Sequence, residues 1–111
     1  MLKTIDKATV KTLMGELKAG LQAIYGDRLK GVYLYGSYAR GEADPESDLD
    51  VLVVLDRIDR YHAEIERTSQ LGAGLSLKYS VSISKVYKRE RDWLERESSF
   101  LANVREEAIA A

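Results

Sequence analysis

The sequence predicts an α/β (α+β) fold in which helices cover a small sheet, and three observations support this prediction. Apolar residues over 7–25 recur at three-and-four spacing, which is typical of an amphipathic helix. The segments 30–35 and 48–55 are short runs rich in β-branched, aromatic and aliphatic residues, as expected for strands. Helix and strand patterns then alternate to the end of the chain, which favours helices packed on a sheet.

The two early strands are expected to be neighbours. The first, 30–35, stops at Gly36, and Ser37–Arg40 is expected to form one turn of helix before a polar loop. Gly36 and Asp48 are only twelve positions apart, which is barely enough for a parallel crossover through a helix. We therefore predict an antiparallel pair that brings Gly36 beside Asp48.

A helix is expected after the second strand. Asp56 or Asp59 could cap its first turn. It is expected to run to about Leu71, and Gly72 and Gly74 are typical of a helix end. The residues expected on its buried side are Tyr61, Ile65, Thr68 and Leu71.

The last third of the chain predicts one more strand and two helices. The strand is expected over Leu77–Val86, where apolar residues alternate with Ser80, Ser82 and Ser84. A first helix is expected over about 88–97, and a second is expected to start at Ser98 or Ser99. The residues expected to pack these two helices are Trp93, Leu94, Phe100, Leu101, Val104 and Ile109.

Length, charge and cysteine content limit the classes of function. The 111 residues fit one domain, 1–111. With 17 Lys and Arg against 18 Asp and Glu, no general basic field attracts a polynucleotide, so a nucleic-acid substrate is not expected. The absence of cysteine excludes thiolate zinc sites and a cysteine nucleophile.

The longest aliphatic run, 51–55, is too short to cross a bilayer, and no signal-peptide pattern is present. We therefore expect a cytoplasmic protein without a membrane partner.

Asp48 and Asp50 are the first candidates for chemistry. Because they lie two positions apart on an expected strand, both carboxylates leave the same face. Two like charges at one place repel, and hard oxygen ligands of this kind suit Mg²⁺, which is often bound by one or two carboxylates together with substrate phosphates. The alternative is that Asp48 caps the turn and Asp50 is a solvated residue at the strand start.

The Gly36-Ser37 pair points to an anion beside these carboxylates. A glycine after a strand lets the backbone approach a ligand closely. The amides that open the following turn, together with the Ser37 hydroxyl, could bind a phosphate. The combination of Gly-Ser, ten residues and Asp-x-Asp between two expected strands is far more specific than either pair alone.

Residues 36–53, GSYARGEADPESDLDVLV, resemble the signature of the minimal nucleotidyltransferases of the DNA polymerase beta superfamily. The likeness extends over nearly the whole chain, including the terminal segment SSFLANVREEA. It implies the nucleotidyltransferase fold, with a small mixed sheet of three to four strands. It also implies that Gly36 and Ser37 hold a triphosphate and that the catalytic pair Asp48 and Asp50 binds Mg²⁺. The implied reaction transfers a nucleoside monophosphate from an NTP to a hydroxyl.

The expected third strand departs from this family pattern. Members of the superfamily usually carry a third carboxylate there, and Leu77–Val86 contains no acid. A serine, Ser80, Ser82 or Ser84, would occupy the matching face. Three interpretations follow: catalysis with one metal, an acid borrowed from Glu90 or from a partner, or a nucleotide-binding protein without turnover.

The resemblance also implies a partner. Family members of this length resemble the smaller half of toxin–antitoxin pairs, whose other half is an all-helical HEPN protein. The leading hypothesis is therefore an antitoxin that neutralises a HEPN toxin by transferring AMP from ATP to a tyrosine. Two rivals stay open: a catalytically degenerate nucleotide-binding module that masks its partner by contact, and an antibiotic-type small-molecule nucleotidyltransferase. A homo-oligomer stays open as well, because the second rival would need a dimer to build its acceptor pocket.

Two further residues of the motif are expected near the nucleotide. Arg40 lies one helical turn after Ser37 and could reach a phosphate, with a surface ion pair to Glu42 or Asp44 as the alternative. Tyr38 lies inside the motif and is expected to adjoin the nucleotide.

Several other side chains are interpreted as structural. Tyr33 and Tyr35 are expected to pack rather than to stack on a base. His62 is expected on the surface, because one unpartnered histidine makes no metal site. A basic group could guide a triphosphate or acceptor, although a solvated basic face is favoured: Lys85, Lys88, Arg89 and Arg91.

Overall fold

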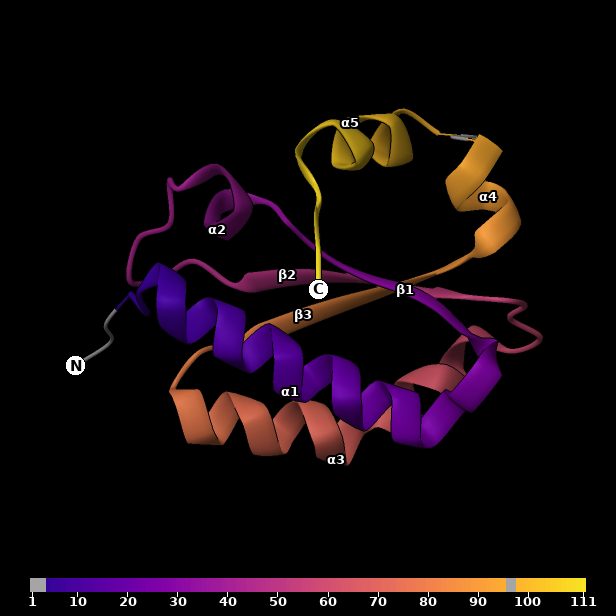
Figure 1. The fold of residues 1–111 in the computed structure, drawn as a ribbon, viewed down its shortest axis with the longest axis horizontal. Coiled ribbons are helices and arrows are strands. Elements are labelled where there is room, and N and C mark those ends of the chain that lie inside the picture. The colour runs from indigo at the N-terminus through magenta and orange to yellow at the C-terminus, as the bar shows by residue number, and fades with distance from the viewer. Residues whose placement is uncertain (1–3, 96–97) are drawn as a thin grey trace.

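A computed structural model describes residues 4–95 and 98–111 and contains one four-stranded sheet (Figure 1). The strand order is β3-β2-β1-β4. β1 pairs antiparallel with both β2 and β4, whereas β2 and β3 are parallel. The strands are β1 (Leu29–Tyr35), β2 (Leu49–Leu55), β3 (Ile83–Arg89) and β4 (Ile109–Ala110). The predicted mixed α/β fold and the antiparallel pairing of the first two strands are confirmed.

Helices cover both faces of the sheet. The longest helices, α1 and α3, lie side by side on one face, and α4 and α5 lie on the other (Figure 1). The short α2 connects β1 to the loop before β2. The helices are α1 (Lys7–Tyr25), the 3₁₀ turn η1 (Gly26–Arg28), α2 (Ser37–Arg40), α3 (Tyr61–Tyr79), α4 (Glu90–Glu95) and α5 (Ser99–Glu107).

The central strand β2 separates two apolar cores. Its odd-numbered residues pack with α1, whose apolar stripe is buried as its spacing predicts. Leu52 and Val54 point to the opposite face, where they pack with Trp93, Leu101 and Val104 of α4 and α5. Because side chains alternate along a strand, Asp50 lies on the same face as Leu52. The acidic residue therefore faces the α5 side of the sheet.

The expectation that α3 ends at Gly72 and Gly74 is wrong. The helix continues to Tyr79 and ends at Ser80, which adopts a left-handed conformation with φ of 53°. Gly72 is buried against the Lys85 side chain, where a Cβ would overlap Nζ, so this glycine allows close packing of α3 on β3. Glycine within a helix costs only about 1 kcal/mol relative to alanine.

The buried face of α3 is also displaced from the expected one. Tyr61 and Ile65 are 43% and 44% exposed, whereas Glu64 and Thr68 are buried. Glu64 accepts a hydrogen bond of 2.8 Å from the Tyr25 hydroxyl and is ion-paired with Arg28 and Arg67. These partners satisfy the hydrogen-bonding groups of the buried Glu64 carboxylate. This charged residue can therefore lie on the buried face of α3, although the spacing of hydrophobic residues alone predicts that it is exposed.

The third strand lies later in the chain than predicted. Leu77 belongs to α3 and is 84% exposed, and β3 begins at Ile83. At the C-terminus, Ile109 belongs to β4 rather than to a helix and is half exposed, while Phe100 is 40% exposed. The first terminal helix begins at Glu90, and Arg96 and Glu97 of the predicted range lie outside the described residues. The second helix begins at Ser99 with Ser98 as its cap, as predicted.

None of the helices within residues 4–95 and 98–111 is both long and apolar enough to span a bilayer.

Candidate functional site

The candidate site lies where β1 ends and β2 begins. Tyr35, the last residue of β1, is the register partner of Asp50. The next residue, Gly36, is buried and has φ of +75° and ψ of −157°, a conformation that side-chain-bearing residues rarely adopt. A Cβ at Gly36 would also overlap the Asp50 carboxylate. The predicted proximity of the glycine to the acidic pair is therefore confirmed, with Asp50 rather than Asp48 in direct contact.

The turn after Gly36 forms as predicted. The amides of Ala39 and Arg40 donate to the Gly36 carbonyl at 3.0 and 3.1 Å, which closes the single turn of α2. Gly41 ends the turn in a left-handed conformation with φ of +72°. The chain then loops back to β2, so residues 36–40 and Asp50 lie at the same edge of the sheet.

Asp48 does not cap the turn before β2. That role belongs to Asp44, whose Oδ1 accepts from the Glu46 amide at 2.8 Å and whose own amide donates to the Ser47 hydroxyl at 2.9 Å. Asp48 is exposed and Asp50 is half-buried. The structure thus leaves both carboxylates available at the sheet edge.

The pKa of Asp50 depends on its burial and on the charges around it. Burial raises the pKa of Asp50 above its ordinary value, and the negative charges of Asp48 and Glu107 also raise it, while the Arg40 guanidinium acts in the opposite direction. Within the described part of the chain, no three His, Cys, Asp or Glu side chains gather closely enough to hold a metal ion. One exposed and one half-buried carboxylate that offer only oxygen donors still fit Mg²⁺, whose shell is often completed by water and substrate phosphates.

Replacing Asp50 by asparagine is expected to stabilise the metal-free protein at neutral pH. Because the folded-state pKa of Asp50 lies above its unfolded value, the folded state binds this proton more tightly. The free energy of unfolding therefore falls as pH rises between those two pKa values and stays lower above them. Asp50→Asn removes this charge and should raise the Tm by about 2–4 °C at pH 7.

The same substitution should have little effect near pH 3. The ordinary pKa of an aspartic acid is about 3.9, and the folded-state pKa of Asp50 is higher. The carboxyl group is therefore mostly protonated at pH 3 in both the folded and the unfolded state. Thermal melts in a chelating buffer at the two pH values measure this difference. A Tm gain of equal size at both pH values, or a loss at pH 7, would contradict the assignment of repulsion to Asp50.

The third strand supplies no acid to this site. Ser84 is the parallel register partner of Asp50, so it lies on the same face and occupies the position where the sequence analysis expects a serine. Glu90, the acid considered as a substitute, begins α4 six residues beyond Ser84, which corresponds to about 20 Å along an extended strand. Glu90 therefore cannot take part in the Asp48–Asp50 site in this arrangement.

Glu107 is the site residue that the sequence analysis missed. It is the last residue of α5, and its Oε1 accepts a hydrogen bond of 3.0 Å from the Gly36 amide. Its Oε2 accepts a bond of 3.0 Å from Nη1 of Arg40. The residue lies far from the motif in sequence, and only the packing of α5 beside β1 and β2 brings it there.

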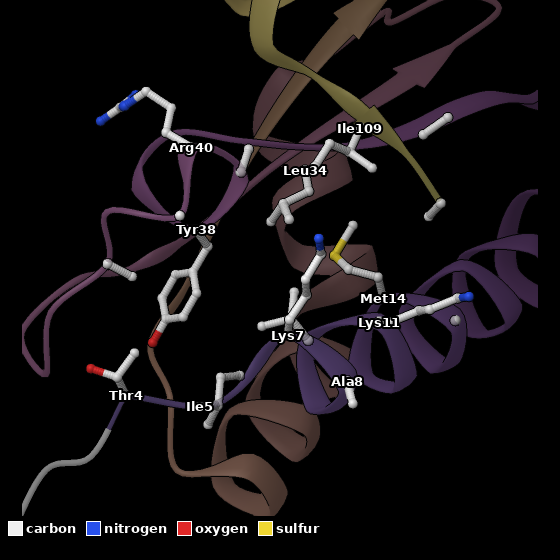
Figure 2. Close-up of a pocket in the computed structure, with 17 residues that line it drawn as sticks. Thr4, Ile5, Lys7, Ala8, Lys11, Met14, Leu34, Tyr38, Arg40 and Ile109 are labelled. Carbon is white, nitrogen blue, oxygen red and sulfur yellow. The ribbon is translucent and has the colours of Figure 1, made fainter.

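The motif residues Arg40 and Tyr38 point to different places. Arg40 forms the expected surface ion pair with Glu42. It also forms an ion pair with Glu107, which places its guanidinium beside the acidic site. Tyr38 extends from α2 toward Thr4 and Ile5 on the α1 side of the sheet (Figure 2). There it lines an apolar pocket of about 1110 Å³. The structure therefore does not bring Tyr38 to the Asp50 face.

The tyrosines and the histidine interpreted as structural take packing or surface positions. Tyr33 packs on Trp93 with ring centroids 4.8 Å apart, and Tyr35 meets Phe100 edge-on at 5.7 Å. Burial, together with the charge of Asp50, raises the pKa of Tyr35 to about 12, so its phenol stays neutral. His62 is exposed on α3, where it pairs with Glu66.

The basic residues near β3 do not converge on the site. Lys85 turns toward α3, where it contacts Gly72, whereas Lys88 lies over the Phe100 ring on the opposite face. Arg89 and Arg91 pair with Asp92 and Glu95 at the far end of β3. The four residues therefore do not form one solvated basic face, because Lys85 is half-buried and only Arg89 and Arg91 are exposed.

The chain is similar in sequence to proteins of known families. The sequence profile of the family described as "Nucleotidyltransferase domain" matches residues 14–108. A protein of Methanocaldococcus jannaschii with the provisional name of protein adenylyltransferase is 37% identical over 78 residues, which is 69% of this chain and 78% of that protein.

Two solved structures share the fold. One, described as a toxin–antitoxin with AMP-PNP, has a TM-score of 0.58 at 20% identity, over 85% of this chain and 68% of that one. The other contains a tri-AMPylated HEPN toxin of Shewanella oneidensis in complex with an MNT antitoxin, with a TM-score of 0.54 at 17% identity, over 90% and 69%. At these identities the likeness establishes the arrangement of helices and strands.

Proposed function

The chain belongs to the nucleotidyltransferase domain family, and on that basis we propose that it transfers AMP from ATP to a tyrosine hydroxyl of a HEPN-type toxin. The observation that carries this proposal is the acidic pair Asp48 and Asp50 beside the open backbone of Gly36. The provisional name of its relative and the AMPylated toxin in one structural neighbour support protein as the acceptor. The chain would act as the antitoxin of the pair.

The residues of the first turn would hold the triphosphate. The Gly36 amide points toward the α5 side of the site and the Ser37 hydroxyl follows it at the start of α2. Arg40 presents its guanidinium to the same place, where it already binds a carboxylate. Backbone amides and a guanidinium are the donors that commonly bind phosphate oxygens.

Asp48 and Asp50 would hold Mg²⁺, since the family generally uses a divalent metal with an NTP. When bound, the ion would offset the negative charge of the triphosphate and of the leaving pyrophosphate. The carboxylates keep their place because Leu49 and Val51, their neighbours in β2, are fully buried. In the reaction the acceptor oxygen bonds to the α-phosphorus, the bond from that phosphorus to the bridging oxygen breaks, and the phenolic proton goes to solvent.

A phenol suits a site in which Ser84 stands where the third carboxylate is usual. Tyrosine has a pKa of about 10 and is far more acidic than an aliphatic alcohol. It therefore needs less help from a general base than a serine or sugar hydroxyl needs. This chemistry favours tyrosine as the acceptor over the hydroxyl groups of an antibiotic.

A non-catalytic antitoxin that masks its toxin by contact is the second candidate. Ser84 beside Asp50 favours it, because serine is a weak ligand for Mg²⁺ and a poor base. The two candidates share the fold and the partner and differ only in turnover.

Incubation of the protein with α-labelled ATP, Mg²⁺ and the product of the adjacent gene separates these candidates. Label on the partner protein supports adenylylation, and its loss in a parallel reaction with chelator confirms that a metal is required. A stable complex without label supports masking. If neither label nor complex forms, the antitoxin role is wrong, and label transfer to small molecules would point to the antibiotic-type activity.

A further inference from the structure

We propose that Glu107 is an internal substitute for phosphate, which occupies the Gly36 amide and the Arg40 guanidinium until a nucleotide displaces it. This inference rests on the proposed function, because it assigns the same two donors to the triphosphate. It adds a regulatory element: the end of α5 competes with the nucleotide for the site.

The contacts of Glu107 match those of a bound anion. Each carboxylate oxygen has its own donor, Gly36 N for Oε1 and Arg40 Nη1 for Oε2, and both distances are 3.0 Å. A backbone amide and a guanidinium that hold one carboxylate from two sides form a charge-assisted site that a phosphate could use equally well. The Glu107 side chain is 25% exposed, so water and solutes can reach the contact.

The position of Glu107 is set by the fold around it. Leu101 and Val104 of α5 are buried in the core on this face of the sheet. On the other side of Glu107, Ile109 and Ala110 of β4 pair with β1. The segments before and after Glu107 are both anchored, so the Glu107 carboxylate stays close to Gly36. Its effective concentration at the site is therefore high.

Helix stability does not account for an acid at this position. A negative charge in the last turn of a helix is unfavourable, because the free carbonyls there carry partial negative charge. Burial raises the pKa of Glu107, but the hydrogen bonds from Arg40 and Gly36 lower it below the ordinary value, so the side chain is an anion at neutral pH. The contacts to Gly36 and Arg40 are thus the interactions that favour it.

A triphosphate and Glu107 cannot use the same donors at once. Nucleotide binding must therefore release Glu107, and the apparent affinity is reduced by the fraction of molecules in which the donors are occupied. Asp48 and Asp50 already give this edge negative charge, so removal of a third carboxylate also reduces repulsion of the phosphates. A variant without the Glu107 carboxylate should bind nucleotide roughly three- to tenfold more tightly.

Isothermal titration of AMP-PNP with Mg²⁺ into four proteins tests this inference: wild type, Glu107→Ala, Glu107→Gln and Glu106→Ala. Glu107→Ala should bind roughly three- to tenfold more tightly, and Glu107→Gln should gain less, because its amide oxygen can still accept from Gly36. Glu106→Ala removes an exposed acid one residue away and should bind like wild type. Thermal melts verify folding, and Glu107→Gln decides the question if the alanine variant is unstable.

The sign of the change separates the interpretations. If Glu107 only braces the loop, both Glu107 variants bind nucleotide more weakly or unchanged, and the inference is wrong while the proposed function stands. If Glu106→Ala gains as much as Glu107→Ala, general charge reduction explains the effect and the specific displacement is wrong. If none of the four proteins binds AMP-PNP, the proposed function itself fails, and the inference with it.

Discussion

Asp48→Asn and Asp50→Asn are each expected to reduce AMP transfer roughly a thousandfold while the fold remains intact. Asparagine keeps the size of the side chain and removes the charge that would hold a divalent cation against the triphosphate, an interaction worth several kcal/mol in the transition state. Neither carboxylate packs in the apolar cores, and Asp48 is exposed. Initial rates of label transfer, with circular dichroism of each variant, measure both parts of the expectation.

Asp59→Asn is the matched control for this pair. It makes the same chemical change at an exposed acid, 80% accessible, whose nearby partner is Arg57 in the loop before α3. This variant should transfer AMP at the wild-type rate. If the Asp48 and Asp50 variants keep transfer rates within a few-fold of this control, the acidic pair is not the metal site.

Gly36→Ala is expected to remove nearly all transfer, by roughly a hundredfold or more, and to lower stability by about 1–3 kcal/mol. The stability loss follows from φ of +75°, which alanine adopts only under strain. The activity loss has a second cause, because the added Cβ would overlap the Asp50 carboxylate and force it to move. The backbone that we propose as the phosphate contact would shift as well.

Gly26→Ala separates these two causes. Gly26 has a comparable conformation, with φ of 57° and ψ of −129°, and a Cβ there would meet no atom within 4 Å. It lies at the end of α1, before β1 begins, whereas Gly36 follows the last residue of β1. It should lose a similar amount of stability and keep its activity. If both variants lose transfer to the same degree, strain alone explains the effect and the contact between Gly36 and Asp50 has no role.

The sequence predicted the part of the site that local patterns encode. Residues 30–35 and 48–55 are rich in the apolar, β-branched and aromatic residues that are typical of strands. The connection between them is too short for a parallel crossover through a helix, so it favours antiparallel pairing. That pairing places Gly36 at Asp50. The single turn of α2 follows from the glycines on either side, Gly36 and Gly41, which allow the chain to turn sharply.

The remaining elements depend on contacts that local patterns do not encode. Gly72 is a typical helix end in isolation, but its lack of a side chain lets α3 pack closely on Lys85 and continue. The inward position of Glu64 depends on Tyr25, Arg28 and Arg67, of which two lie in other elements. Because α3 continues to Tyr79, β3 begins at Ile83 rather than at the predicted Leu77.

Glu107 illustrates the same limit at the site. Nothing in its neighbours along the chain indicates contact with Gly36 or Arg40, because the contact arises from the way α5 returns across the sheet (Figure 1). Tyr38 shows the converse. It lies within the motif, yet the direction of its turn sends the ring to the α1 side of the sheet.

The proposed activity of the edge formed by Gly36, Asp48 and Asp50 is transfer of AMP to a tyrosine of a HEPN-type partner. Mass spectrometry of the intact partner and of its peptides, after co-expression with wild type or with the Asp48→Asn, Asp50→Asn double variant, detects this modification. The partner should gain the mass of AMP on a tyrosine with wild type and remain unmodified with the double variant. If the partner is unmodified in both cases, or equally modified in both, this edge does not transfer AMP to it.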